Sequence, residues 1–356
     1  MKKIVIIQSV FENMKLFFVD KPIRKRLLAA ILCLGVCPVF AQSIVYHVEN
    51  FGFFDNRETK SPYQFSETLF GTRLGAELGV KRGANSVYGG YVVLEEFGNL
   101  ELAHKEWTFY YQYRDHGVTG AFGSFPRRLL RRELPESFLD DSIRYYNPNL
   151  YGALIQRTGE NGFAELYCNW RGRQSHEQRE IFEISADGEY AFSSLPFALS
   201  TGFFAQLTHF SVRKGKTPDK VYDKVMLNPY VSTSFNLGLI DTFTITAGAL
   251  ASFNRDRTDK IWKTPLGFMG DVQMRKGAFE LGNHLYAGKP QLTDFERYGM
   301  ELHQGDSYYR SAFYDRVDFT AYLLERKNLD CHFTASFHFS EGVMDNTQVL
   351  YVHILF

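Results

Sequence analysis

The stretch from Thr68 to Lys81 reads TLFGTRLGAELGVK, and its residues alternate between two kinds along its whole length. Residues of one parity are mainly apolar, namely Phe70, Thr72, Leu74, Ala76, Leu78 and Val80. Residues of the other parity are glycine or charged, namely Gly71, Arg73, Gly75, Glu77, Gly79 and Lys81. Successive side chains of a strand point to opposite faces, so this period of two predicts a β-strand between an apolar and an aqueous environment.

The same alternation recurs along the chain as far as the C-terminus. It is clearest in segments 106–114, 164–171, 243–254 and 330–339, and no segment of helical length has a 3.6-residue period. Many of these runs reach the ~9–11 residues that a membrane-crossing strand needs, whereas strands of soluble sheets have ~5–6 residues. We therefore expect an all-β fold, a transmembrane antiparallel up-and-down β-barrel. An exported soluble β-sandwich is the alternative.

The composition excludes several other classes of protein. Of the 356 residues 16% are aromatic, which is too many for a disordered chain. Four cysteines are too few for a disulfide scaffold. Because the chain has a single long apolar run, a helical membrane protein with several spans is also excluded.

That apolar run, Leu27 to Phe40, follows the basic segment 21–26 and is shorter than a membrane span. This order is typical of a signal peptide, with cleavage expected after Ala41. Because residues 1–20 form an unusual extension, Met14 is an alternative start. The same run could instead be a lipoprotein signal at a nearby cysteine or an uncleaved N-terminal anchor. We expect a signal peptide in residues 1–41 and a barrel over residues 42–356.

The expected barrel is acidic. Without residues 1–41 the chain has 33 basic and 38 acidic side chains, a net charge of −5. Such a balance gives no support for nucleic-acid binding.

Short turns alternate with longer connections between the predicted strands. Seven short turns and eight longer connections, the last near 341–345, predict about sixteen strands with both termini at the short-turn end. The final residues alternate toward a C-terminal phenylalanine, namely Leu350, Val352, Ile354 and Phe356. This pattern resembles the C-terminal strand signal by which the barrel-assembly machinery recognises outer-membrane proteins.

The longest irregular segment that directly follows a strand is residues 126–149, PRRLLRRELPESFLDDSIRYYNPN. In general porins, which this layout resembles, the third outer loop folds into the lumen and narrows the pore. Here that loop carries both signs of charge, namely Arg127, Arg128, Arg131, Arg132, Glu133, Glu136, Asp140, Asp141 and Arg144. Opposite charges across a pore select solutes by charge and size, so these residues are candidates for a pore constriction. Alternatively, they pair with one another and with the wall and hold a plug.

Three arginines of the strands are candidates for the lumen wall, namely Arg73, Arg114 and Arg171. Segments 123–127, 141–149 and 169–175 resemble uncharacterised outer-membrane barrel proteins of diderm bacteria. The resemblance spans residues 50–190 and implies a porin-like barrel in outer-membrane lipid, with no assigned substrate. Porins often form homotrimers, although no stretch of this sequence marks a trimer contact.

We therefore expect a channel for passive diffusion of small hydrophilic solutes, without a cofactor. A metal site is not expected, because Cys168 and Cys331 fall on the lipid-facing parity of strands that are far apart. One alternative is a plugged barrel that acts in surface binding, adhesion or nutrient uptake.

A second alternative is a barrel hydrolase that uses the neighbouring Ser336 and His338, with His332 or His284. Lipase-type barrels place their catalytic residues on the lipid-facing side, whereas these histidines lie on the polar parity. From this we expect that the protein is not an enzyme.

Overall fold

The computed structural model describes residues 43–99, 103–193, 197–215 and 220–356. The expected signal peptide and its cleavage site lie outside the described residues. No helix among the described residues is long and apolar enough to cross a membrane.

The described chain forms one antiparallel sheet of 17 strands, in which each strand pairs with its neighbours along the chain. The barrel wall consists of β1 (Ser43–Glu58), β2 (Glu67–Arg82), β3 (Asn85–Glu96), β4 (His104–Asp115), β5 (Val118–Pro126), β6 (Asn149–Thr158), β7 (Gly162–Gly172), β8 (Ile181–Ala191), β9 (Ala198–Phe210), β10 (Tyr222–Phe235), β11 (Thr242–Asp256), β13 (Leu266–Lys276), β14 (Phe279–Gly288), β15 (Phe313–Arg326), β16 (Leu329–Ser340) and β17 (Val343–Leu355). The remaining strand, β12 (Trp262–Lys263), is a two-residue addition beside β11 in a long connection.

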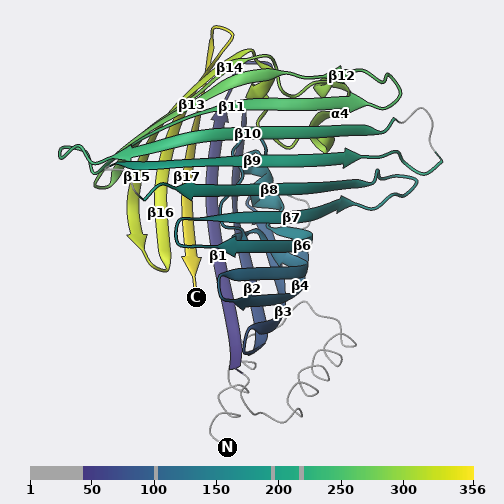
Figure 1. Cartoon of the computed structure of the whole chain (residues 1–356), viewed down its shortest axis with the longest axis vertical. Coiled ribbons are helices and arrows are strands. Elements are labelled where there is room, and N and C mark those ends of the chain that lie inside the picture. Colours follow the sequence, from purple (N-terminus) through teal and green to yellow (C-terminus); the bar gives the residue numbers. More distant parts are fainter. Residues whose placement is uncertain (1–42, 100–102, 194–196, 216–219) are drawn as a thin grey trace, which may run out of the picture. The chain divides into compact units, whose positions relative to one another are not determined.

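The first and last strands close the barrel. Strand β1, purple in Figure 1, lies beside the yellow β17 and pairs with it from Glu49↔Leu355 to Glu58↔Asn346. The terminal Phe356 exchanges two backbone hydrogen bonds of 3.0 and 2.9 Å with Val48. The predicted barrel of about sixteen strands, with both termini at the end where short turns join the strands, is confirmed. In bacterial outer-membrane barrels this short-turn end faces the periplasm and the long-loop end faces outward.

The two parities of each strand lie on the two faces of the wall. In β2 the apolar Phe70, Leu74 and Leu78 are 48%, 50% and 54% exposed on the outside, whereas Glu77 points inward and is 8% exposed. An apolar exterior around a polar interior is the arrangement of a transmembrane barrel.

Two long connections fill part of the lumen. One contains the 3₁₀ helix η1 (Arg127–Leu129) and helix α3 (Asp141–Tyr146), and the other contains helix α4 (Phe295–Leu302) and the 3₁₀ helix η2 (Ser307–Arg310). We call residues 127–148 and 289–312 together the lumenal plug. These helices are too short to produce a periodic sequence pattern.

The connection expected near 341–345 is instead a tight turn at Glu341 and Gly342, both with positive φ.

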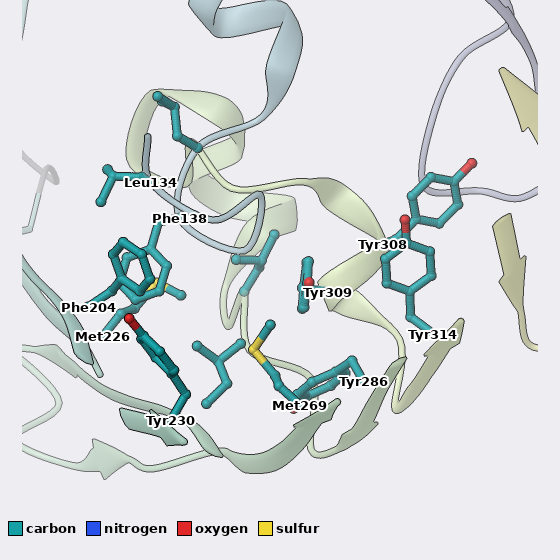
Figure 2. Packing of buried hydrophobic residues seen from close by; sticks show 13 residues of the cluster. Leu134, Phe138, Phe204, Met226, Tyr230, Met269, Tyr286, Tyr308, Tyr309 and Tyr314 are labelled. Atoms are coloured by element: carbon teal, nitrogen blue, oxygen red, sulfur yellow. The ribbon is translucent and has the colours of Figure 1, made fainter. Parts of the chain in front are cut away.

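Apolar side chains hold the plug against the inner wall (Figure 2). Leu134 and Phe138 of the first segment pack with Phe204 and Met226 of the wall in one buried cluster. Tyr309 of the second segment belongs to the same cluster. Full burial of a side chain of this kind stabilises a fold by about 1.5–3 kcal/mol. The apolar residues within the charged loop therefore explain why it lies inside the barrel.

The two plug segments also bind each other through their backbones. The Asp140 N–H donates to the Gln304 carbonyl over 2.7 Å, and the Asp306 N–H donates to the Glu136 carbonyl over 2.8 Å. Gly305 lies at this crossing, where a Cβ atom would be 2.1 Å from the carbonyl oxygen of Ser137. Only a glycine allows this close approach.

We predict that Gly305→Ala separates the two segments and destabilises the protein by about 1–3 kcal/mol, because the added methyl overlaps a backbone oxygen. The measurement is thermal unfolding of the detergent-solubilised barrel, together with tryptic cleavage within residues 127–148. The control is Gly52→Ala, whose Cβ atom would have no neighbour closer than 3.9 Å. Equal stability and equal trypsin resistance in the two variants would contradict the prediction.

A second prediction concerns the buried Asp306, whose carboxylate accepts hydrogen bonds from the Tyr308 N–H and from Gln64 Nε2. Burial, together with the nearby Asp140 and Glu136, raises the pKa of the Asp306 carboxyl above its ordinary value. The folded state therefore holds a proton that the unfolded chain releases near pH 4. The stability contributed by this group is complete below that pH and is lost as the pH rises toward the raised pKa.

Asp306→Asn keeps the accepting oxygen but carries no charge. Between pH 5 and pH 8 the unfolding temperature of the wild-type barrel should fall more steeply than that of Asp306→Asn. Thermal unfolding at several pH values measures both slopes, and parallel slopes would refute the assignment.

Candidate functional site

The arginines of the 126–149 loop bind carboxylates of the barrel wall. Arg128 forms an ion pair with Glu77 of β2. Arg132 Nε lies 3.2 Å from Asp187 and its Nη1 lies 3.1 Å from Glu189, both on β8. The Arg132 guanidinium also lies over the ring of Phe204, 4.2 Å from the ring centroid. These contacts connect the plug to two separate parts of the wall, β2 and β8.

Other charged residues of the loop form ion pairs or hydrogen bonds within the loop itself. Arg144 Nη1 lies 2.5 Å from Glu133 and 2.9 Å from Asp141. Asp140 caps helix α3, since its carboxylate accepts a hydrogen bond of 2.8 Å from the Ser142 N–H.

Two loop arginines and one wall arginine have no carboxylate partner within the described part of the chain. Arg127 Nε donates to the Asn147 carbonyl over 2.7 Å. Arg131 binds Glu165 only through its backbone N–H, while its guanidinium lies over the ring of Phe163, 5.5 Å from the centroid. Arg114 lines the same cavity as these two arginines.

The other two wall candidates hold the plug. Arg73 Nη1 donates to the backbone carbonyl of Arg144 over 2.8 Å, and its Nη2 lies 3.0 Å from Glu49. Arg171 Nη1 lies 2.9 Å from Glu183, and its Nη2 donates to the Glu301 carbonyl over 2.8 Å. The structure thus places these side chains against the two plug segments. It stays a prediction that the nine charged loop residues and the three wall arginines narrow a pore.

Space remains inside the barrel beside the plug. One cavity of about 930 Å³ is bordered by Arg128 and Arg144 of the plug and by Asn328 and Phe356 at the short-turn end. A second cavity of about 460 Å³ is bordered by residues that include Arg132, Tyr230 and His284. Both volumes are within the range of small-molecule pockets.

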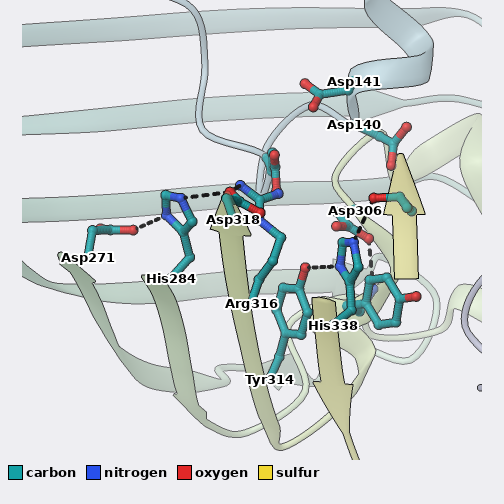
Figure 3. Close-up of polar contacts among 12 residues, drawn as sticks. Asp140, Asp141, Asp271, His284, Asp306, Tyr314, Arg316, Asp318 and His338 are labelled. Atoms are coloured by element: carbon teal, nitrogen blue, oxygen red, sulfur yellow. Dashed lines mark hydrogen bonds and ion pairs between the residues drawn. The ribbon is translucent and has the colours of Figure 1, made fainter. Parts of the chain in front are cut away.

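A chain of charges runs along the inner wall beside the second cavity, over the adjacent strands β13, β14 and β15 (Figure 3). His284 lies 2.6 Å from Asp271 and 3.4 Å from Asp318, and Arg316 lies 2.9 Å from Asp318. Arg316 also forms an ion pair with Glu136 of the plug. Burial opposes ionisation of Glu136, but Arg316 outweighs it and lowers the pKa of the Glu136 carboxyl to about 2.

Two of the lumenal histidines that the sequence singled out, His284 and His338, have both ring nitrogens occupied. The third, His332, is bound only through Nδ1, which lies 2.6 Å from Asp330. His284 lies between the carboxylates of Asp271 and Asp318, which bind its two ring nitrogens. His338 binds the Tyr314 hydroxyl through Nδ1 over 2.8 Å and the Thr347 hydroxyl through Nε2 over 3.2 Å. Neither imidazole has a free nitrogen for a substrate proton. The pairing of Ser336 with His338 that the sequence raised as a hydrolase site is therefore not supported by this geometry.

A histidine on the outer surface of the wall is arranged differently. His209 Nδ1 lies 2.8 Å from the Asp223 carboxylate, and Arg257 donates to the same carboxylate from Nε over 2.6 Å and from Nη2 over 3.1 Å. An ionised carboxylate only accepts hydrogen bonds, so Nδ1 carries the proton and Nε2 is left as the acceptor. We call His209, Asp223 and Arg257 the rim site.

The rim site lies outside the lumen, at the long-loop end. In β9 the buried Phe204, Gln206, Thr208 and Phe210 have the inward parity, which leaves His209 on the outward one. The His209 ring lies 5.0 Å from that of Phe182, which stacks on Trp170 at 5.6 Å. Aromatic side chains of this kind mark the level where a barrel passes from lipid to water. Sequence analysis missed the site, although a histidine and an aspartate on the apolar parity of two strands were a visible signal.

Among the described residues, no group of three or more His, Cys, Asp or Glu side chains is placed to hold a metal ion.

Solved structures with similar architecture are outer-membrane barrels. OpdL of Pseudomonas aeruginosa has a TM-score of 0.51 and 12% identity over 88% of this chain and 99% of that chain. OccK5 (OpdH) of Pseudomonas aeruginosa has a TM-score of 0.50 and 9% identity over 88% and 98% of the two chains. A variant of the Rh. blastica porin has a TM-score of 0.48 and 11% identity over 88% and 100%. At these identities the likeness to the two Pseudomonas proteins shows the fold, a porin-like outer-membrane barrel.

None of the curated proteins compared with this chain matches its sequence. A family model described as lipid A 3'-O-deacylase-type matches residues 38–355. That description names an enzyme, so the expectation that the protein is not an enzyme is wrong. Because the match covers nearly the whole chain, including all of the barrel strands, the chain belongs to the lipid A 3'-O-deacylase-type family.

Proposed function

We propose that the protein hydrolyses a fatty-acyl ester of an outer-membrane lipid at the rim site. The observation that carries the proposal is the His209–Asp223 pair on the lipid-facing surface, with Nε2 free. The family name directs the choice of substrate to lipid A, whose acyl chains lie in the membrane beside the wall. A lipid can reach the rim site sideways from the membrane without entering the plugged lumen.

The residues of the rim site suit hydrolysis by a water molecule. Asp223 holds Nδ1–H of His209, and Nε2 takes a proton from water while the water oxygen bonds to the ester carbonyl carbon. Arg257 is 55% exposed at its side chain and has Nη1 free to face the oxygen that becomes negative. When the carbon–oxygen bond to the alcohol breaks, the leaving oxygen takes the proton back from Nε2. The products are a fatty acid and an alcohol.

We predict that His209→Gln lowers the rate of fatty-acid release by about 10²–10⁴-fold, because the general base is lost. Asp223→Asn should also lower it, because the imidazole is no longer held in the required tautomer. Release is measured by mass spectrometry with lipid A in mixed detergent micelles.

The matched control is His104→Gln, since His104 also lies at the long-loop end and pairs with a carboxylate, Glu106, over 2.9 Å. This control should keep the wild-type rate. Equal rates for wild type and His209→Gln would exclude the rim site, and no release by the wild type would exclude the hydrolase itself.

A second candidate function, passive diffusion of small hydrophilic solutes, is favoured by the lumenal cavities of about 930 and 460 Å³. Plug residues border both cavities, and the ion pairs of Arg128 and Arg132 hold the plug to the wall. The solute path would run along the charged loop residues.

We predict stable current steps in planar bilayers for the wild type, and larger steps with altered ion selectivity for the double variant Arg128→Gln, Arg132→Gln. The reason is that the plug loses its ion pairs with Glu77 and Asp187. Arg157→Gln serves as the control, because Arg157 is exposed on the outer wall. Electrical silence of all three proteins would reject the channel.

The proposal includes export by the signal peptide, cleavage after Ala41 and insertion by the barrel-assembly machinery. The register supports the role of the C-terminal strand, since Leu350, Val352 and Ile354 pair with β1 at the closing seam. A homotrimer stays a prediction from the resemblance to porins.

A further inference from the structure

The cavity of about 930 Å³ extends from the plug to the short-turn end of the barrel. Its border includes Arg127 and Arg131 on the plug side, Arg114 on the wall, and Asn328 and Phe356 at the short-turn end. A molecule in the periplasm therefore has a direct approach to the cavity if the barrel has the usual orientation.

Each of the five carboxylates that border this cavity already has a partner in the chain. Glu49 lies 3.0 Å from Arg73 and 3.3 Å from His353. Asp330 lies 2.6 Å from His332. The other three are paired with plug arginines: Glu77 with Arg128, and Glu133 and Asp141 with Arg144.

Three guanidinium groups on the same border form no ion pair with a carboxylate among the described residues. Arg114 and Arg131 are exposed, and Arg127 is half-buried with a backbone carbonyl as its partner. Burial lowers the pKa of Arg127, which reports the free-energy cost of keeping this charge unpaired. An anion from outside the chain would remove that cost.

The border also has an apolar part. The rings of Tyr88 and Tyr110 stack at 4.9 Å with an interplanar angle of 17°, and Phe51 and Tyr351 lie at 5.4 Å from each other. A bare inorganic ion would leave these surfaces in water. A small organic anion would use both the rings and the guanidinium groups.

We propose that this cavity binds a small organic anion, carrying carboxylate or phosphate groups, through Arg114, Arg127 and Arg131. Guanidinium groups bind both kinds of oxyanion through paired N–H donors, so the recognition chemistry is shared. This binding rests neither on the hydrolysis of lipid nor on an open pore, because the cavity is reached from the short-turn end.

The test is isothermal titration calorimetry of the full barrel in detergent with succinate, glucose 6-phosphate and inorganic phosphate, and with glucose as the neutral control. We expect saturable binding of succinate or glucose 6-phosphate, weaker binding of inorganic phosphate and none of glucose. Which organic anion binds more tightly distinguishes a carboxylate from a phosphate ligand. Absence of saturable binding of either organic anion would overturn the proposal.

The triple variant Arg114→Gln, Arg127→Gln, Arg131→Gln should bind the preferred anion at least tenfold more weakly. The control Arg157→Gln removes a charge outside the cavity and should bind as the wild type does. Heat-modifiable migration on gels shows whether each variant keeps its barrel, and single Arg→Lys variants provide a milder set that should weaken binding less. Wild-type affinity in a folded triple variant would overturn the assignment. Fatty-acid release measured on the same samples keeps this outcome separate from that of the proposed hydrolysis.

Discussion

In a hydrocarbon layer an unpaired backbone N–H or C=O group costs several kcal/mol, and no water is present to replace a missing partner. The pairing of β1 with β17 removes the last open edge of the sheet, and the rest of the structure depends on it. Because the sheet is closed, alternate residues of every strand face either the lipid or the lumen. The exposed Phe70, Leu74 and Leu78 and the inward Glu77 of β2 are direct consequences.

Closure also creates an interior that charged side chains must fill. The lumenal plug forms ion pairs with charged residues of the inner wall, such as Arg128–Glu77 and Arg316–Glu136. Removal of one partner of such a pair leaves the other charge without compensation in the lumen, and this destabilises the folded barrel. The apolar Leu134 and Phe138 add packing to these charges, so the plug is held by two kinds of interaction. In the larger cavity, by contrast, Arg114, Arg127 and Arg131 have no carboxylate partner among the described residues.

The proposed hydrolysis depends on a histidine–carboxylate pair that lies on the lipid-facing side of the wall. His284, His332 and His338 lie on the polar parity, from which the sequence predicts that the protein is not an enzyme. The family match reverses that conclusion, and the structure shows His284 and His338 bound at both nitrogens. The pair on the lipid-facing parity, His209 and Asp223, is brought together by the register of the consecutive strands β9 and β10.

The sequence by itself determined the strands, their two faces and the closed all-β barrel. The reason is that the alternation of apolar and polar residues is a local property, and it fixes which side chains of a strand face lipid and which face water. It also indicated a charged loop over residues 126–149 that enters the lumen. Only the tertiary structure decided which charges form ion pairs, where the second plug segment crosses the first, and which histidine meets a carboxylate on the lipid-facing side. Those outcomes depend on pairs such as Asp306 with Glu136, or His209 with Asp223, whose distances arise from strand register and loop packing rather than from neighbouring residues.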